Sequence, residues 1–307
     1  MAIVDNPKSP LIAKLEGVHL WHFEGAPCAQ RVRFALVERG LRRGREVPWY
    51  SDKPVDCVGE PGRWVSRHVS LIKKDHITPE YAAIQPNMVV PALVHDGVLH
   101  IESMDIVKYV DDHWPGEKLI PADPERLNLN DDLVTQAKAL HRSVRFVSFR
   151  WGLRSLGKLN AKEEAQLKQL EQQDSPEKMA EFYSGFDSGT IPQAVYLDHL
   201  RRLEAGYARI DGLLDGDGRR FLTGATLTPA DIIWSLSVLR ISECGYPFAE
   251  HYPALADWYG RISQRPGFRE GVMARNRFLS GAFKAKAAVE NLFGKGLRQA
   301  SQLPVSA

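Results

Sequence analysis

The side chain with the clearest chemistry is the thiol of Cys28, which follows a break in the pattern at residues 24–27 (EGAP). Helical periodicity starts just after it, so we expect Cys28 in the first turn of a helix. The N–H groups there stabilise a thiolate and lower the thiol pKa, and Arg31 and His22 could add positive charge nearby. The opposite interpretation is that Cys28 packs as a small apolar residue, as free cysteines commonly do.

The other two cysteines, Cys57 and Cys244, complete a count of three. The three form no CxxC pair and no metal-ligand cluster. An odd, sparse count is typical of a reducing compartment rather than of a disulfide framework. We therefore expect no metal site, and we interpret Cys57 and Cys244 as structural or incidental.

Length and composition predict a soluble protein of two domains. The 307 residues exceed what one hydrophobic core usually serves. Forty Lys and Arg against 38 Asp and Glu give a formal net charge of +2, which indicates no strong field for nucleic acid. No apolar run approaches the roughly 20 residues of a transmembrane helix, and residues 1–14 are not typical of a signal peptide. We expect a cytoplasmic protein that binds neither nucleic acid nor membrane.

The elements that must position Cys28 alternate between strand and helix patterns. The strand patterns lie at residues 18–23, 46–50, 89–94 and 98–101. The helical patterns lie at residues 29–39, at 71–83 and from 102 onward. An Asp-Gly turn joins the last two strand patterns as a hairpin. The order β-α-β-α-β-β-α is typical of a thioredoxin-like domain.

Two stretches of this half depart from regular patterns. Pro91 lies in the third strand pattern, where proline normally argues against a central strand; a cis bond at the start of the strand would remove the objection. Residues 51–67 are rich in Pro, Gly and Asp, and we interpret them as an inserted loop.

The rest of the chain has helical patterns only. They lie at residues 127–151, 162–173, 193–214, 229–241 and 254–264, with a further helix expected in the tail from 282 to 307. Thr228 and Asp231 form the acidic variant of a capping box. A proline-bearing turn at 120–124 marks the linker. We predict an N-terminal extension at 1–17, a thioredoxin-like domain at 18–121 and an all-helical domain with a C-terminal tail at 122–307.

Five motifs in matching order resemble the cytosolic glutathione transferase superfamily. They are APCAQRVR at 26–33, NMVVPAL at 87–93, ESMDIVKY at 102–109, FLTG with TPAD between 221 and 231, and YPALADW with RPGF between 252 and 268. The resemblance covers residues 18–268 and implies the glutathione transferase fold, a thioredoxin-like domain followed by an all-α domain. It also implies an enzyme that uses glutathione as a co-substrate and forms a homodimer.

The resemblance implies where glutathione would bind. Val90, before a cis Pro91, would pair its backbone with the cysteinyl amide of the tripeptide, like one more strand. Ser103 and the N–H groups of its helix start would hold the γ-glutamyl carboxylate. Glu102 could receive the ammonium group. The alternative is that Glu102 and Ser103 are a capping pair without a ligand.

The glycine end of glutathione needs a cation. Lys74 is the candidate that we assign, with Lys73 and His76 as the other possible cations. All three residues could equally belong to a solvated face of the protein.

In the family, either a hydroxyl activates the glutathione thiol or the enzyme supplies its own cysteine. Ala26 stands where related classes place a serine, so Cys28 is the reactive side chain that remains in the loop. This loop resembles those of the maleylacetoacetate isomerase-like (zeta) class and of the glutathione-dependent reductive dehalogenases of chlorinated hydroquinones. The chain also lengthens the helical domain between residues 151 and 193, as those dehalogenases and the lignin β-etherases do.

The function implied is attack of the glutathione thiolate on a small hydrophobic aromatic electrophile, by conjugation, aryl-ether cleavage or reductive dehalogenation. Such an enzyme serves detoxification or the degradation of aromatic compounds. Cys28 would lie near the glutathione sulfur, or would itself attack a glutathionyl conjugate and form a mixed disulfide. The alternatives are a glutathione-dependent thiol–disulfide oxidoreductase and a non-catalytic binding protein of the same fold.

The aromatic substrate is expected against the helix at residues 127–151. His141, Arg145 and Phe149 offer aromatic and cationic groups there, and we assign them to the substrate pocket. A helix of this kind is also commonly part of a core or of a dimer interface.

Overall fold

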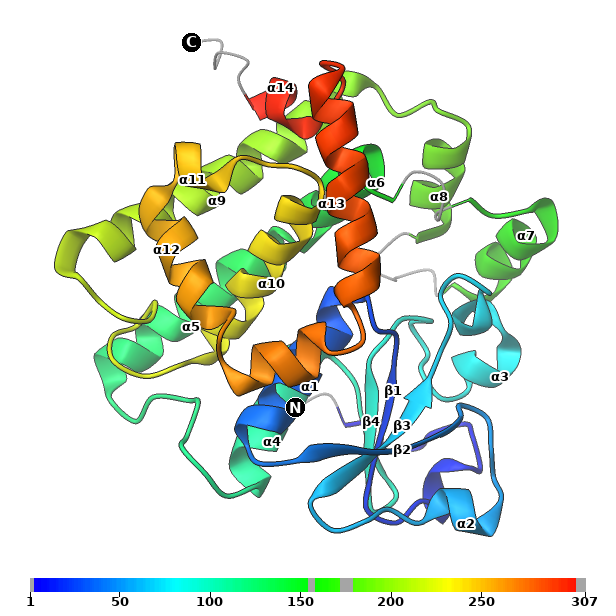
Figure 1. Ribbon diagram of the computed structural model, residues 1–307. Helices are drawn as coiled ribbons and strands as arrows, with labels where there is room; N and C mark the ends of the chain where they lie inside the picture. Colours follow the sequence, from blue (N-terminus) through cyan, green and yellow to red (C-terminus); the bar gives the residue numbers. More distant parts are fainter. Residues whose placement is uncertain (1–2, 154–157, 172–178, 302–307) are drawn as a thin grey trace. The chain divides into compact units, whose positions relative to one another are not determined.

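The computed structural model describes residues 3–153, 158–171 and 179–301 of the chain. These residues belong to two compact units (Figure 1). The first unit comprises residues 1–118, 158–188 and 270–272, and the second comprises 119–157, 189–269 and 273–307. The described residues of 158–188, which follow the predicted linker in the chain, thus belong to the unit that contains the sheet. The predicted boundary at residue 121 remains a prediction.

One mixed sheet of five strands, in the order β2-β3-β1-β4-β5, forms the centre of the first unit. The strands are β1 (Val18–His22), β2 (Arg42–Pro48), β3 (Arg63–His68), β4 (Ala92–His95) and β5 (Val98–His100). β1 runs parallel to β3 and antiparallel to β4, so that Leu20 lies opposite Ser66 on one side and Leu93 on the other. β4 and β5 form the predicted hairpin. The sheet confirms the thioredoxin-like class.

Strand β3 corrects the interpretation of residues 51–67 as an inserted loop. It lies between β1 and β2 in the sheet, and the short helix α2 (Pro54–Cys57) precedes it. The segment was missed because its buried positions do not alternate with exposed ones: Trp64 and Val65 are followed directly by the buried polar residues Ser66 and Arg67. Arg67 is fully buried and donates to the carbonyl oxygens of Ser51 and Asp56 at 2.8 Å. A strand without apolar alternation gives no periodic pattern.

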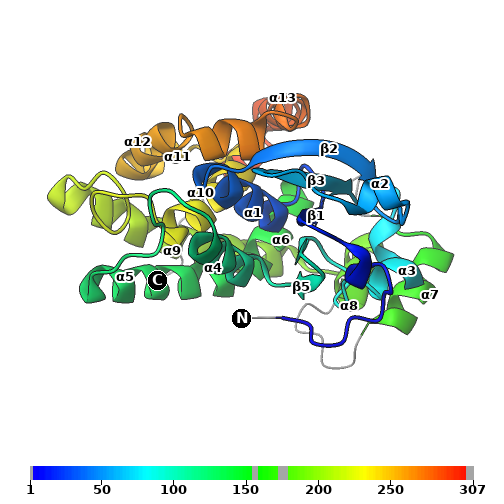
Figure 2. The same ribbon diagram turned by 90° about the horizontal axis from the view of Figure 1, so that it is seen from below.

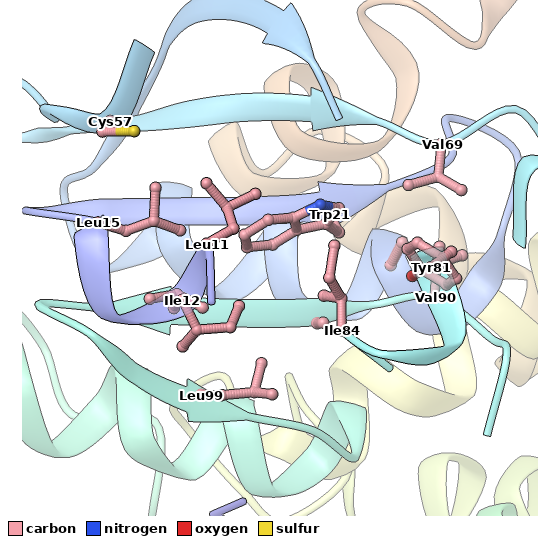
Figure 3. Close-up of a cluster of buried hydrophobic side chains, with 13 residues drawn as sticks. Leu11, Ile12, Leu15, Trp21, Cys57, Val69, Tyr81, Ile84, Val90 and Leu99 are labelled. Carbon is pink, nitrogen blue, oxygen red and sulfur yellow. The ribbon is translucent and has the colours of Figure 1, made fainter. Parts of the chain in front are cut away.

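Both faces of the sheet are covered, and all five residues of β1 are buried. Helices α1 (Pro27–Glu38) and α4 (Ser103–His113) pack against each other and lie side by side in Figure 2. A hydrophobic cluster includes Trp21 of β1, Cys57 and Val90 (Figure 3). Three short elements, η1 (Ile12–Lys14), η2 (Asp75–Ile77) and α3 (Pro79–Ala82), complete this part of the unit.

The first unit also contains α7 (Ala161–Leu170) and α8 (Met179–Asp187). Leu167 and Ala180 of these helices pack on Ile77 and Met88 in a second buried cluster. The predicted helix at 162–173 ends at Leu170, and residues 172–173 lie outside the described residues. These helices therefore support the segment that leads into Val90.

The second unit is helical throughout its described part. Its helices are α5 (Pro124–Ala139), α6 (His141–Trp151), α9 (Gln193–Asp217), α10 (Pro229–Glu243), α11 (Phe248–His251), α12 (Pro253–Ile262), α13 (Arg277–Leu292) and α14 (Leu297–Ser301). A π-helical segment, Gly267–Met273, has residues in both units, because 270–272 belong to the first. The single helix predicted at 127–151 is wrong, because α5 and α6 meet at Leu140. The tail helix starts earlier than predicted, and residues 302–307 lie outside the description. None of the helices in the described ranges is long and apolar enough to cross a membrane.

Candidate active site

Cys28 occupies the second position of α1, directly after Pro27. The residue before the helix is Ala26, whose side chain makes no capping hydrogen bond. Cys28 is half-buried, whereas Cys57 and Cys244 are both buried. Burial raises the pKa of the Cys244 thiol to about 12. Cys28 is therefore the most accessible of the three thiols.

Arg31 connects Cys28 to the start of α4. Its Nη1 lies 3.5 Å from Sγ of Cys28 and 3.2 Å from Oγ of Ser103. The side chain is only 6% exposed, and its Nε has no hydrogen-bond partner among the described residues. A guanidinium in this position favours an ionised thiol and offers a donor to an anion. Of the two cations expected near Cys28, Arg31 makes a direct contact with the sulfur.

A buried polar network holds the loop that precedes Cys28. His22 bonds to Ser66 through Nε2 at 2.8 Å and to Nη1 of Arg33 through Nδ1 at 3.1 Å. Arg33 donates to the carbonyl oxygens of Glu24 at 2.8 Å and of Gly271 at 2.7 Å. Because Arg33 is 1% exposed, these bonds compensate the burial of its charge and fix the loop.

Glu102 and Ser103 lie at the start of α4, where the sequence predicted a helix to begin. Ser103 is 8% exposed, so Oγ meets Arg31 in the interior. Glu102 is exposed, and its φ of 65° with ψ of 107° is outside the regions that L-residues usually adopt. Nδ2 of Asn87 lies 3.5 Å from Oε1 of Glu102. The backbone of Glu102 is thus strained, and its exposed carboxylate is next in the chain to Ser103, whose hydroxyl contacts the buried Arg31. Strained backbone of this kind is typical of ligand-binding sites.

The peptide bond between Val90 and Pro91 is cis, as the family resemblance implied. Strand β4 begins at Ala92, so the proline stands just before the strand and removes no hydrogen bond from the sheet. The hydroxyl of Tyr81 donates to the carbonyl oxygen of Val89 at 2.8 Å, and the side chain of Val90 packs in the cluster of Figure 3. The backbone at Val90 is thus held from both sides.

The three candidate cations for the glycine end differ in their surroundings. Burial lowers the pKa of Lys74, and the carboxylate of Glu163 on α7 opposes that shift. Lys73 is exposed. His76 is 7% exposed, and burial followed by the charge of Lys74 lowers the pKa of His76 to about 4. His76 is therefore neutral at pH 7, so it does not serve as a cation there.

Glu163 is a residue of this region that the sequence analysis missed. Its Oε2 accepts a hydrogen bond from the backbone N–H of Asn160 at 2.8 Å, within the capping box that starts α7. The spacing of Asn160 and Glu163 indicates a helix start, but nothing in the sequence indicates that this helix packs next to Lys74. The proximity of Glu163 to Lys74 therefore depends on tertiary packing.

The predicted substrate contacts belong to the second unit. His141, Arg145 and Phe149 repeat every four residues on α6, so they lie on one face, and each is partly buried. On another face of α6, Oγ of Ser143 lies 2.9 Å from Nδ1 of His199 on α9. Their role in substrate binding stays a prediction.

Both halves of the chain match models of one family. The model described as "Glutathione S-transferase, N-terminal domain" matches residues 20–118, and the model described as "Glutathione S-transferase, C-terminal domain" matches residues 161–266. The chain belongs to the glutathione S-transferase superfamily. Members of this superfamily are enzymes that use glutathione as a co-substrate.

Relatives within the superfamily include a zeta-class glutathione S-transferase from Euphorbia esula. It is 24% identical over 273 residues, which cover 89% of this chain and 94% of the relative. The protein LigF from Sphingobium sp. strain SYK-6 is 26% identical over 227 residues, covering 71% of this chain and 87% of LigF. The crystal structure of LigF, named as a beta-etherase, has a TM-score of 0.65 at 20% identity and covers 83% of this chain and 98% of LigF.

One match has higher identity but is shorter. Glutathione S-transferase 1 from Dianthus caryophyllus is 30% identical over 118 residues, which are 38% of this chain and 44% of that relative. This match therefore spans less than half of that relative's length.

In the part of the chain that the structure describes, no group of three or more His, Cys, Asp or Glu side chains could hold a metal ion.

Proposed function

We propose that this protein is a glutathione-dependent transferase that acts on a small hydrophobic aromatic electrophile at a site containing Cys28. The observation that carries the proposal is the contact of Arg31 with both Cys28 and Ser103. One guanidinium thereby joins the helix start that bears the thiol to the helix start that would hold the γ-glutamyl carboxylate. Bound glutathione would extend between these two points with its sulfur near Cys28.

The rest of the tripeptide would bind to groups of the same compact unit. The backbone of Val90, before Pro91, would pair with the cysteinyl amide as an added strand. The carboxylate of Glu102 would meet the ammonium group. Lys74 would meet the glycyl carboxylate, in competition with Glu163, which already faces it. Each charged group of glutathione would thus have a partner of complementary charge.

The proposed reaction begins with the thiolate of glutathione. Its sulfur forms a bond to the electrophilic carbon while the bond from that carbon to oxygen or halogen breaks, and aryloxide or halide leaves with the electron pair. Arg31 and the N–H groups of the first turn of α1 would stabilise the sulfur anion before the attack. The similarity to LigF, named as a beta-etherase, supports an aryl ether as the substrate class.

A second step would use Cys28 as a nucleophile. The Cys28 thiolate attacks the sulfur of the glutathionyl conjugate, the sulfur–carbon bond breaks, and the carbon takes the electron pair and a proton. A second glutathione then displaces Cys28 from the mixed disulfide. The substrate carbon gains two electrons, and two molecules of glutathione become one glutathione disulfide.

The test is a panel of aryl ethers, haloaromatics and disulfides assayed with glutathione. Wild type is compared with Cys28→Ala and with Cys244→Ala, which removes a buried thiol instead. We expect a loss on the order of 100-fold in kcat/KM for Cys28→Ala only. Mass spectrometry of the products separates a glutathione conjugate from glutathione disulfide. Equal activity of Cys28→Ala, or no heat of binding with millimolar glutathione, would contradict the proposal.

A thiol–disulfide oxidoreductase is the second candidate function. It is favoured by the accessibility of Cys28, which contrasts with the burial of the other two cysteines. This function predicts turnover of hydroxyethyl disulfide and a glutathione adduct on Cys28 in the absence of any aromatic substrate. A non-catalytic protein of the same fold would show neither activity.

We further propose that the enzyme is a cytoplasmic homodimer, as the family resemblance implies. Sedimentation velocity of the purified chain tests the stoichiometry, and fractionation of cells tests the location. A monomer at micromolar concentration would contradict the first point.

A further inference from the structure

Helix α13 presents a continuous apolar stripe to solvent. Its members are Phe278, Ala282, Ala285, Val289 and Leu292, which repeat every three or four residues and therefore share one face. All of them are exposed, and Phe278 and Leu292 are 91% and 82% exposed. With Phe293 at 70%, the stripe contains the three most exposed large hydrophobic side chains of the described chain. A face of this kind on a soluble protein usually has a partner.

The opposite face of α13 already has its packing partner in the second unit. Ser280 and Ala287 on that face are 2% exposed, and the helix packs against α10 (Figure 1). Nδ2 of Asn291 donates to the carbonyl oxygen of Gly245 at 3.1 Å, just beyond the end of α10. The helix is thus anchored through one side, so a rotation that buries the stripe would break this packing.

The segment that contains the stripe is rich in basic residues. Residues 275–298 contain six Lys and Arg and a single acidic residue, Glu290. The basic residues are Arg275, Arg277, Lys284, Lys286, Lys295 and Arg298. The segment has a formal charge of +5 and the whole chain has +2, so the difference leaves −3 on all other residues together. The small net charge of the protein therefore conceals a strongly basic segment.

We propose that α13 docks on the surface of an anionic lipid bilayer. Helices that lie in the membrane interface combine an apolar stripe with basic flanks and a low overall hydrophobicity. Phe278, Leu292 and Phe293 would enter the boundary between headgroups and acyl chains. Lys284 and Lys295 would meet the negative headgroups, whose surface potential attracts such residues. The expectation of no membrane partner rested on the lack of an apolar run long enough to span a bilayer, and a helix that lies in the interface needs no such run.

A second copy of the chain is a poorer match to the same face. Two α13 helices paired through their stripes would place two segments of +5 next to each other. The one acid of the segment, Glu290, is already 3.7 Å from Lys286 of its own helix. Like charges placed together across an interface weaken association. An anionic surface offers the opposite charge along the whole stripe.

The experiment is flotation of the full-length protein with lipid vesicles. Vesicles of phosphatidylcholine are compared with vesicles of equal parts phosphatidylcholine and phosphatidylserine. We expect binding to the mixed vesicles, weaker binding to phosphatidylcholine alone, and release at high salt, which screens the charges. Phe278→Ser combined with Leu292→Ser, and separately Lys284→Glu combined with Lys295→Glu, should each weaken binding by about 10-fold or more.

Matched controls lie in the first unit. Val55→Ser replaces a side chain that is 64% exposed, and Lys108→Glu reverses an exposed charge on α4; both should bind the mixed vesicles as wild type does. Absence of binding to mixed vesicles, or an equal loss in the controls, overturns the proposal. So does conversion of a dimer to a monomer by Phe278→Ser without any change in vesicle binding, which assigns the face to a second copy. Turnover with glutathione should be unchanged in all variants, because none of the substituted residues is assigned to the proposed catalytic site.

Discussion

The starts of α1 and α10 share a proline at the first helical position and differ in the side chains that surround it. Both helices have proline at the first position, Pro27 in α1 and Pro229 in α10. In α10 the hydroxyl of Thr228 and the carboxylate of Asp231 form a reciprocal capping box. In α1 the residue before the proline is Ala26, which makes no side-chain cap. One helix start is closed by its own side chains, and the other is left for the Cys28 thiol.

The closed start is a structural junction. Asp231 is fully buried and accepts four hydrogen bonds of 2.9 Å, from the N–H of Leu222, the N–H and hydroxyl of Thr228, and the indole of Trp258. These bonds tie α10 to the preceding turn and to α12. At α1 the polar group in the first turn is a thiol, and its partner Arg31 leads to another helix start. A helix start without side-chain caps keeps its N–H groups available for a ligand anion.

The largest effect on stability is expected when the hydrogen bonds of Asp231 at the start of α10 are disrupted. Asp231→Asn replaces a carboxylate oxygen by an amide that cannot accept from all four donors. We expect the free energy of unfolding in urea to fall by about 3 to 5 kcal/mol. Asp211→Asn is the control, since Asp211 accepts a single backbone bond, from Leu255 at 2.9 Å; its cost should be about 1 kcal/mol. Equal losses in the two variants would contradict the view that the four hydrogen bonds of Asp231 stabilise the protein more than the single bond of Asp211 does.

Lowering the pH should reduce the stability of the first unit more than that of the second. Burial lowers the pKa of His19, His76 and His100, all in the first unit, to about 4 from 6.5. Between these values the unfolded chain binds more protons, so the stabilisation is complete above pH 6.5 and is lost as the pH falls toward 4. A single histidine contributes on the order of 3 kcal/mol at most.

Hydrogen exchange at pH 7 and pH 5 measures this difference. The amides of β1 should lose protection at a higher pH than those of α10. His19→Gln should lower the number of protons taken up on unfolding by about one. Simultaneous loss of protection in β1 and α10 at every pH would show that the histidines do not act locally.

Removal of the guanidinium at the open start should slow the reaction of Cys28. In Arg31→Gln we expect alkylation by iodoacetamide at pH 7 to be about 10-fold slower, because the charge that favours the thiolate is gone. Arg31→Lys keeps the charge but not the two-way hydrogen bonding, so its rate should be intermediate. The measurement is the alkylation rate as a function of pH, with the site of modification identified by mass spectrometry. An unchanged pH profile in Arg31→Gln would contradict the assigned role.

The smallest effect is expected when the open start is given a cap. Ala26→Ser adds a hydroxyl that can accept from the first-turn N–H groups of α1, as Thr228 does in α10. We expect the free energy of unfolding to rise by about 0.5 to 1 kcal/mol, and Thr228→Ala to lower it by about 1 to 2 kcal/mol. Urea unfolding of both variants checks the pair. No gain in Ala26→Ser would mean that these N–H groups have other partners.

Much of the fold was predictable because it depends on neighbours in the sequence. The Asp-Gly turn at 96–97 predicts the β4–β5 hairpin, and both residues have positive φ. Thr228 and Asp231 predict the start of α10. A cis bond before Pro91 would reconcile that proline with a strand, and the bond is cis. Each of these features follows from backbone and side-chain chemistry within a few residues.

The elements that sequence reasoning missed depend on distant partners. Strand β3 has polar residues at buried positions, and Arg67 is accommodated only because carbonyl oxygens of Ser51 and Asp56 are brought to it. Residues 127–151 contain no proline or glycine that would indicate where the helix is interrupted at Leu140. Periodicity reports which residues prefer burial, and it does not report which buried charge will find a partner.

The helix start that bears Cys28, the motifs of the family and the basic segment around α13 can therefore be read from the order of residues alone. Only the tertiary structure decided that Arg31 meets Ser103, 72 positions away in the chain, and that Glu163 approaches Lys74. Contacts of this kind depend on how strands and helices pack, because packing sets which side chains share a desolvated space. The chemistry of the proposed site lies in those contacts, and its residue types alone do not specify it.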